Sequence, residues 1–548
     1  MSFFEDFNPT LSLHHFFNTT TLIMKQLITF FLGFFFVAAV VAQPNIEWQK
    51  RMGGTGDDFI SSFAQTLDGG YIGFGSTSSN DGDVSGLHGD YDIWVVKLGA
   101  EGDIQWQKTF GGTKYDSFSA GNIEQTSDGG YIFVGVTESS NGDVSHLFGM
   151  NDVWVVKIDN LGSIQWEKTF GDSGYDYPGS IHQTKDGGYF LTMSYDPFFS
   201  VYDDYGLFKL DALGNIKWRR TYGGSGVESI GPMALTNDGG CVMSGYSRSS
   251  DGDVTGHHGS EDRDDYWIVK VDSLGVMEWE RSLGGSENDH PRAIIQTTNG
   301  EYLISGWSVS TDGDVTGHHP PLSGFDTPDT WIVKLDKDGL LVWERSMGGS
   351  GTDDLFAINQ ADDGGFILAG IARSSDGDVP GIVQGNADVW LLKLSESGST
   401  EWQRLLGGSS GDAAYYSFLQ TNDGGYIFPG ISYSVDGDVL PAGFGGLSDC
   451  WLVKLSPESV PTTAPSAQTG TLEIFPNPAQ QSITINLPET EVAFSLSITD
   501  ILGRELSRQT VQNGTPLDVS ALPNGIYCAT AFTSAEKVFV RKFNIQKG

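Results

Sequence analysis

Residues 106–157 read WQKTFGGTKYDSFSAGNIEQTSDGGYIFVGVTESSNGDVSHLFGMNDVWVVK, and this stretch decides the fold. A tryptophan opens it, an Asp-Gly-Gly turn divides it, an Asn-Gly-Asp loop follows, and an apolar run ending in lysine closes it. The phrase recurs seven times, and from the first opening tryptophan to the last six intervals cover 354 residues, an average of 59. A fixed period of this size indicates a solenoid or a propeller. The opening tryptophans are Trp48, Trp106, Trp166, Trp218, Trp279, Trp343 and Trp402.

The order of turns within each repeat favours the propeller. Asp-Gly-Gly before an aromatic residue, as at 128–131, is a tight hairpin turn flanked by apolar runs. A second glycine turn then leads to the next opening tryptophan, so each repeat has two hairpins, or four short strands, and no helical period. Four strands in about 60 residues make one propeller blade.

The two ends of the repeat series predict how the ring closes. The series starts at residues 46–53 with a strand of the type that ends every other unit, and it stops at 449–454 with a third strand that lacks its fourth. The first strand can therefore complete the last blade and remove an exposed edge. We predict an all-β, seven-bladed β-propeller over 46–456, because a solenoid would need distinct capping repeats that the sequence does not show.

Two charged positions recur in all seven repeats. One is a carboxylate ten residues after the opening tryptophan, and the other is the lysine that closes the third strand. A catalytic group is needed once, so a sevenfold group is expected to hold the blades together through ion pairs or loop hydrogen bonds. The carboxylates, called here the rim acids, are Asp58, Asp116, Asp176, Glu228, Asp289, Asp353 and Asp412, and the lysines are Lys97, Lys157, Lys209, Lys270, Lys334, Lys393 and Lys454.

Six repeats also carry a loop that reads Asx-Gly-Asp. Two oxygen-bearing side chains around a glycine suit a hard cation such as Ca²⁺, which needs six to eight oxygen ligands. The alternative is an Asx turn between the second and third strands. Strand order puts these loops on the same rim as the rim acids, which predicts an acidic rim for Ca²⁺ or a cationic ligand. The candidate ligands are Asp81 and Asp83, Asn141 and Asp143, Asp251 and Asp253, Asp312 and Asp314, Asp376 and Asp378, and Asp436 and Asp438.

The third repeat replaces this loop with an aromatic segment at 195–202. Its residues Phe198, Phe199 and Tyr202 are candidates for stacking on a sugar or binding a partner, because aromatic side chains on a loop favour such contacts. The alternative is that the loop folds back on its own blade.

Composition limits the classes of partner. The chain has 548 residues with 31 Lys and Arg against 70 Asp and Glu, a net charge of −39. The negative electrostatic field of such a chain repels phosphate backbones, so we expect no nucleic-acid partner. No motif for nucleophilic catalysis, phosphate binding or dinucleotide binding stands in its required context, so no catalytic residue and no cofactor other than Ca²⁺ is predicted.

The N-terminal region has the pattern of an export signal. A lysine next to Met24 precedes an apolar run that ends near Ala42, too short for a membrane span of about 20 residues. We expect 24–42 to be a signal peptide, with residues 1–23 a non-native extension before the true start at Met24.

After a Pro/Ser/Thr linker at 457–470, residues 471–548 show the alternation of a small β-sandwich. Their motif residues are Phe475, Pro476, Asn477, Pro478, Gly503, Asn524, Gly525, Tyr527, Lys537 and Lys542. These motifs resemble the type A C-terminal sorting domain of the type IX secretion system. The resemblance implies Sec export, passage across the outer membrane, and release or attachment at the cell surface, with the secretion machinery as partner and membrane contact through surface attachment.

Together these features predict a secreted propeller that acts as an extracellular or cell-surface binding module for a glycan or protein. The alternatives are an extracellular polysaccharide-active enzyme on a propeller scaffold, with its site at the centre of the ring or at the third repeat, and a surface scaffold that binds no small ligand.

Overall fold

The computed structural model describes residues 43–119, 121–195, 204–320, 327–439, 449–458, 472–487, 493–500, 505–532 and 538–547. The described chain divides into two compact units. One runs from Gln43 to Glu458, and the other lies within 472–547. Among the described residues no helix is long and apolar enough to cross a membrane. The predicted segments 1–23 and 24–42, and linker residues 459–470, lie outside the described residues.

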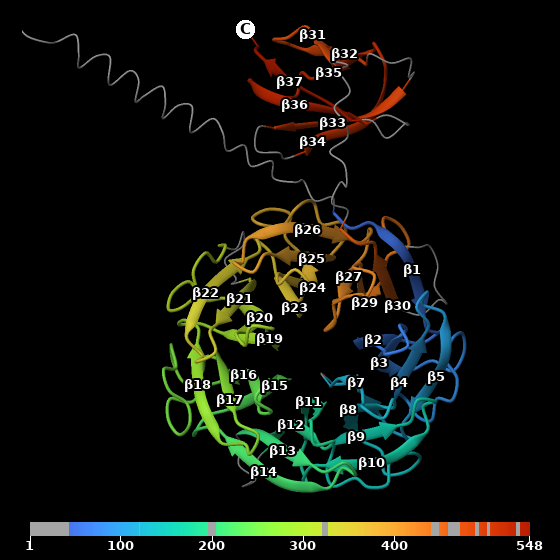
Figure 1. Cartoon of the computed structure of the whole chain (residues 1–548), viewed down its shortest axis with the longest axis vertical. Coiled ribbons are helices and arrows are strands. Elements are labelled where there is room, and N and C mark those ends of the chain that lie inside the picture. The colour runs from blue at the N-terminus through green and yellow to red at the C-terminus, as the bar shows by residue number, and fades with distance from the viewer. Residues whose placement is uncertain are drawn as a thin grey trace, which may run out of the picture. The chain divides into compact units, whose positions relative to one another are not determined.

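Seven antiparallel sheets form a closed ring in the first unit, which confirms the seven-bladed propeller (Figure 1). Each blade has its first strand at the centre of the ring and its last at the circumference. Blade 1 consists of β2 (Asp58–Gln65), β3 (Tyr71–Thr77), β4 (Asp92–Leu98) and β5 (Ile104–Phe110), and blade 2 consists of β6 (Asp116–Ser117), β7 (Ile123–Gln125), β8 (Tyr131–Thr137), β9 (Asp152–Ile158) and β10 (Ile164–Phe170). Blade 3 consists of β11 (Pro178–Gln183), β12 (Tyr189–Tyr195), β13 (Asp204–Leu210) and β14 (Ile216–Tyr222), and blade 4 consists of β15 (Glu228–Leu235), β16 (Cys241–Ser247), β17 (Asp265–Val271) and β18 (Met277–Leu283). Blade 5 consists of β19 (Asp289–Gln296), β20 (Tyr302–Ser308), β21 (Asp329–Leu335) and β22 (Leu341–Met347), and blade 6 consists of β23 (Asp353–Gln360), β24 (Phe366–Ala372), β25 (Asp388–Leu394) and β26 (Thr400–Leu406). Blade 7 consists of β27 (Asp412–Ala414), β28 (Leu419–Gln420), β29 (Tyr426–Ser432), β30 (Asp449–Leu455) and β1 (Ile46–Met52).

The ring closes as the phase of the repeat predicts. Strand β1 pairs antiparallel with β30, with Trp48 opposite Lys454 and Met52 opposite Cys450. The first strand of the unit is therefore the outermost strand of blade 7 (Figure 1). This pairing leaves the last blade with no missing strand and ties together residues about 400 positions apart.

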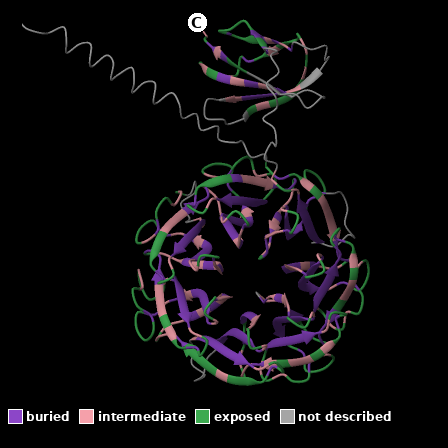
Figure 2. Ribbon diagram, in the orientation of Figure 1, coloured by how far each residue is buried: buried purple, intermediate pink, exposed green. Residues whose placement is uncertain are grey.

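The core lies in the two middle strands of each blade, which are buried along their length, while the outermost strands are part exposed (Figure 2). The tryptophan of the third strand is fully buried in six blades, as Trp94 shows. The opening tryptophan instead lies against the turn of the next blade. A methyl group at Gly162, which has a φ of +78°, would lie 3.1 Å from the ring of Trp106. Glycine at that turn therefore satisfies both the left-handed backbone and the close approach of the ring.

Each third-strand lysine is buried and finds its partner in the preceding hairpin turn. The Lys157 Nζ lies 3.0 Å from an oxygen of Asp128, the aspartate of the Asp-Gly-Gly turn. In blade 5 an asparagine, Asn299, replaces that aspartate, and Lys334 pairs with Glu301 at 2.7 Å instead. The pairing survives because the carboxylate has moved two residues along the same turn. These ion pairs confirm a structural role for the sevenfold lysines.

The second unit is built from two small sheets that share one core. The three-stranded sheet contains β31, β32 and β35, and the four-stranded sheet has the order β34-β33-β36-β37. Apolar side chains of both sheets, including Ile485 and Phe543, form a single buried cluster, as expected for a β-sandwich. The strands are β31 (Glu473–Phe475), β32 (Ser482–Asn486), β33 (Ala493–Asp500), β34 (Glu505–Gln512), β35 (Pro516–Asp518), β36 (Gly525–Phe532) and β37 (Val538–Ile545).

Candidate functional site

The rim acids hold the connections between blades. Asp116 is fully buried, and its carboxylate accepts hydrogen bonds from the Gly112 N–H at 2.8 Å, from Ser139 Oγ at 2.8 Å and from Thr137 Oγ1. The corresponding backbone bond, 2.7–3.0 Å long, is present in all seven blades. The structure therefore gives the rim acids the loop-bonding role that their sevenfold repetition predicts.

A second aspartate, which is buried in most blades, meets rim acids across the blade interface. A methyl group at Gly111 would lie 2.6 Å from Asp116 Oδ2 and 2.9 Å from Asp92 Oδ1, so two carboxylates converge on one glycine. Burial raises the pKa of both acids, and the charge of Asp92 raises that of Asp116 further. The effect is largest at Asp289, where burial raises the pKa from 3.8 to about 7.

The Asx-Gly-Asp loops form hydrogen bonds with the same connections between blades. In all six, the first side chain accepts a hydrogen bond of 2.7–2.9 Å from the N–H that follows the Gly-Gly turn, as Asp81 does from Thr55. The N–H of the second aspartate, such as Asp83, donates to the carbonyl of the first glycine at 2.7–2.9 Å. Within the described residues, no group of three or more His, Cys, Asp or Glu is placed to hold a metal ion. Cation binding by these loops stays a prediction, and the hydrogen bonds of their first side chains run to the neighbouring Gly-Gly connection rather than within an Asx turn.

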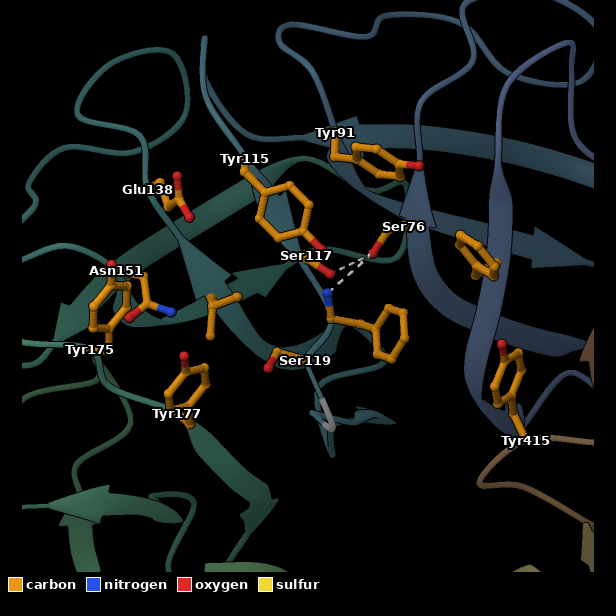
Figure 3. Close-up of a pocket in the computed structure, with 13 residues that line it drawn as sticks. Ser76, Tyr91, Tyr115, Ser117, Ser119, Glu138, Asn151, Tyr175, Tyr177 and Tyr415 are labelled. Carbon is orange, nitrogen blue, oxygen red and sulfur yellow. Dashed lines mark hydrogen bonds between the residues drawn. The ribbon is translucent and has the colours of Figure 1, made fainter. Parts of the chain in front are cut away.

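The aromatic segment of the third repeat lies outside the described residues, so Phe198, Phe199 and Tyr202 stay predictions. The described structure places a different aromatic cluster near the ring axis. The cluster lines a hollow of about 490 Å³. Figure 3 shows the side chains that line it. We call this hollow the tyrosine pocket, after its tyrosines Tyr91, Tyr115, Tyr175, Tyr177 and Tyr415.

The rim-acid scaffold positions the tyrosines. Tyr115 directly precedes the rim acid Asp116, whose N–H donates to the Tyr91 carbonyl at 2.9 Å, and Tyr91 bridges to Tyr115 in parallel. Tyr175 precedes the rim acid of blade 3 in the same way and bridges to Asn151. The pocket therefore lies on the rim that carries the rim acids. The tyrosines come from loops whose backbone is fixed by buried hydrogen bonds.

Irregular inner strands shape the rest of the pocket wall. The inner strand of blade 2 is interrupted between β6 and β7, and Ser119 in the interruption has a φ of +30°, unusual for a residue other than glycine. The inner strand of blade 7 is interrupted between β27 and β28, and Tyr415 follows β27. Strained backbone and broken strands are features that cluster at functional sites.

Polar groups alternate with the aromatic rings. Glu138 and Asn151 line the hollow beside the tyrosines (Figure 3), and the Tyr91 hydroxyl donates to Asp57 at 2.9 Å. At the base, Ser76 and Ser117 share a hydrogen bond of 3.0 Å. Burial raises the pKa of Tyr91, so this phenol stays a neutral donor and acceptor at physiological pH. The pocket thus offers flat apolar faces together with hydroxyl, amide and carboxylate groups.

The tyrosine pocket is not part of the repeat. The position nine residues after the opening tryptophan is tyrosine in blades 2 and 3 alone, and in the other blades it is Asp57, Val227, Asn288, Thr352 or Gly411. Tyr175 is 58% exposed and Tyr177 is 46% exposed. These tyrosines are not among the site residues predicted from the sequence, although their departure from the repeat is a signal that the sequence contains.

The motif residues of the second unit have structural roles where they are described. Tyr527 is buried and donates to the Pro523 carbonyl at 2.8 Å, while Asn477 and Asn524 accept backbone bonds of 2.9 and 2.8 Å. Gly525 begins β36, and Lys542 is exposed on β37. Phe475, Pro476 and Pro478 are exposed, and Gly503 and Lys537 lie outside the described residues.

Comparison with protein families identifies the second unit. Residues 473–546 match the secretion system C-terminal sorting domain, which confirms the resemblance to the type IX sorting domain. Such a domain implies interaction with the type IX machinery and secretion across the outer membrane to the cell surface or exterior. Comparison with curated proteins gives no match.

Solved structures similar to the chain include several propellers. Sqt1 from Chaetomium thermophilum is 10% identical with a TM-score of 0.40, over 75% of this chain and 100% of its own. The Pan2 WD40 domain of Neurospora crassa is 8% identical with a TM-score of 0.41, over 75% and 96% of the two chains. An apocarotenoid oxygenase from Synechocystis is 12% identical with a TM-score of 0.36, over 77% and 95%.

Proposed function

We propose that this secreted propeller is an extracellular glycan-binding module whose binding site is the tyrosine pocket. The observation that carries the proposal is the gathering of non-repeated, exposed tyrosines in one hollow, on a scaffold whose sevenfold acids and lysines make structural hydrogen bonds and ion pairs. Tyr115, Tyr175 and Tyr177 come from two neighbouring blades, so their convergence is a property of the fold.

The chemistry of the pocket favours a sugar over a purely apolar ligand. A pyranose ring has an apolar C–H face and a polar rim, which match a tyrosine ring with amide and carboxylate neighbours such as Asn151 and Glu138. A volume of about 490 Å³ is within the usual range for small-ligand sites. Export by the type IX route would bring the pocket into contact with extracellular polysaccharides.

A glycan array probed with the secreted protein tests the proposal. We expect Tyr115→Ala and Tyr175→Ala each to weaken binding of the best sugar by roughly 5- to 30-fold, the effect of losing about 1–2 kcal/mol at an aromatic contact. Leu161→Ala is the matched control, because Leu161 is 66% exposed in the β9–β10 turn and does not line the pocket.

Two results would contradict this assignment. One is unchanged affinity in both tyrosine variants, which would move the site elsewhere. The other is turnover of the bound sugar, detected as new reducing ends, which would favour the alternative of a polysaccharide-active enzyme.

A further inference from the structure

A second hollow of about 570 Å³ lies between blades 6 and 7. We call it the Arg373 pocket, and its polar wall consists of Arg373, Asn386, Ser409, Ser410 and Tyr433. Arg373 and Tyr433 directly follow the second strands of their blades, β24 and β29. Glu138 holds the equivalent position in blade 2 and lines the tyrosine pocket, so the two pockets use the same level of the ring.

Arg373 differs from the other arginines of the propeller. Six of them lie in outermost strands, and four do not. Three of those four pair with acids: Arg248 with Asp264, Arg263 with Glu287 and Arg292 with Asp354. Arg373 is exposed, and its guanidinium group makes no ion pair or hydrogen bond to any residue that the structure describes. An unpaired arginine at a pocket wall is notable in a chain with 70 acids and 31 bases.

One acid lines the Arg373 pocket, and its carboxylate is already hydrogen-bonded within the protein. Asp412 lines the pocket but is 1% exposed, and its carboxylate accepts bonds from the Gly408 N–H at 2.8 Å, from Ser434 Oγ at 2.7 Å and from Ser432 Oγ. As a rim acid it is committed to the interblade loop. The exposed polar groups of the pocket are the guanidinium, the Asn386 amide and hydroxyls, all of which can donate to an anion.

Blade 7 contributes to both pockets. Tyr415, which follows β27, lines the tyrosine pocket, and Tyr433, which follows β29, lines the Arg373 pocket. The two residues stand at opposite ends of the antiparallel pairing of β27 with β29. An oligosaccharide long enough to span this part of blade 7 would therefore contact both pockets.

We propose that the Arg373 pocket binds the carboxylate or sulfate group of an acidic glycan of which another sugar unit stacks in the tyrosine pocket. This inference rests on the proposed function and names its substrate class. Guanidinium groups pair with carboxylates and sulfates through two parallel N–H bonds, and the protein supplies no competing carboxylate to the Arg373 guanidinium among the residues that the structure describes. The rest of the chain is strongly negative and repels acidic sugars. Arg373 is therefore the group that we expect to favour an acidic sugar over a neutral one.

The test is calorimetric titration of the full secreted chain with oligogalacturonate and with the same oligomer methyl-esterified, which differ in the carboxylate charge. A sulfated carrageenan oligomer and neutral agarose oligomers form the second pair, so the two arms distinguish carboxylate from sulfate. We expect at least tenfold tighter binding of one acidic oligomer than of its neutral counterpart. Arg373→Gln should remove that preference while leaving neutral binding unchanged, and Arg373→Lys should keep part of it.

Lys337→Gln is the control, because it removes the same charge from an exposed turn between β21 and β22. Equal binding of acidic and neutral sugars, or a preference that survives in Arg373→Gln, overturns the inference and leaves the proposed function standing. A glycan array without any binding overturns the proposed function together with it.

Discussion

Replacing Asp289 by asparagine should stabilise the propeller relative to the natural chain by an amount that grows between pH 5 and pH 8. Asp289 is fully buried, and burial together with the charge of Asp265 raises its pKa from 3.8 to about 7. A methyl group at Gly284 would lie 2.5 Å from Asp289 Oδ2 and 2.8 Å from Asp265 Oδ1, so the two carboxylates converge. An asparagine can keep the acceptor for the Gly285 N–H and offer its amide to Asp265.

The magnitude follows from proton linkage. Because the folded-state pKa is raised, Asp289 stays protonated in the folded protein where the unfolded chain is already ionised. Its favourable contribution is complete below about pH 4 and is lost as the pH rises through about 7. From pH 5 to pH 8 the loss is about 1.4 kcal/mol per pH unit up to the folded-state pKa, or about 3 kcal/mol in total. The asparagine side chain of the Asp289→Asn variant does not titrate, so the advantage of the variant over the natural chain should grow by this amount between pH 5 and pH 8.

Urea unfolding followed by tryptophan fluorescence at pH 5, 6, 7 and 8 measures the difference. With an m-value of about 3 kcal/mol/M or more, the difference in unfolding midpoint between the variant and the natural chain should grow by up to about 1 M from pH 5 to pH 8. Asp362→Asn, in an exposed hairpin turn, is the control for the loss of a carboxylate that is not buried. A difference between Asp289→Asn and the natural chain that is constant with pH, or a loss of stability at pH 8, would refute the reasoning.

Three further predictions concern the scaffold, the rim loops and export. Lys393→Met should destabilise the propeller by about 1–3 kcal/mol in chemical unfolding, because Lys393 is buried and pairs with Asp363 and Glu401 at 2.7 and 2.8 Å; an unchanged midpoint would contradict this. Cation binding by the Asx-Gly-Asp loops predicts heat on CaCl₂ titration and a lower unfolding temperature after chelation, and the absence of both would discard it. Deleting residues 471–548 should trap the propeller in the periplasm, as cell fractionation would show, whereas unchanged secretion would contradict the sorting role.

The repeated features of this chain were predictable because they are under packing constraints. The opening tryptophans and Asp-Gly-Gly turns predict the seven blades, and the phase of the repeat predicts the pairing of β1 with β30. Sevenfold acids and lysines predict structural roles. The partner of each lysine was not predicted, since it lies in the preceding hairpin turn about 30 residues away; the exchange at Asn299 and Glu301 is the one trace of that pairing in the sequence.

The tyrosine pocket could not be derived in the same way. Its side chains lie near the ring axis, where neighbouring blades leave space and place little constraint on residue type. The interrupted inner strands did leave a signal, because Gln65 stands seven positions after its rim acid, whereas Gln125 stands nine after Asp116 and Gln420 eight after Asp412. Extra residues predict a bulge, but the direction in which it points depends on packing across blades.

A crystal structure of the secreted chain with the tightest-binding sugar of the glycan array tests the central claim most directly. The account predicts a sugar ring stacked on Tyr115 or Tyr175, with polar contacts to Asn151 or Glu138. Sugar bound away from these tyrosines, or an array on which no sugar binds, would contradict it.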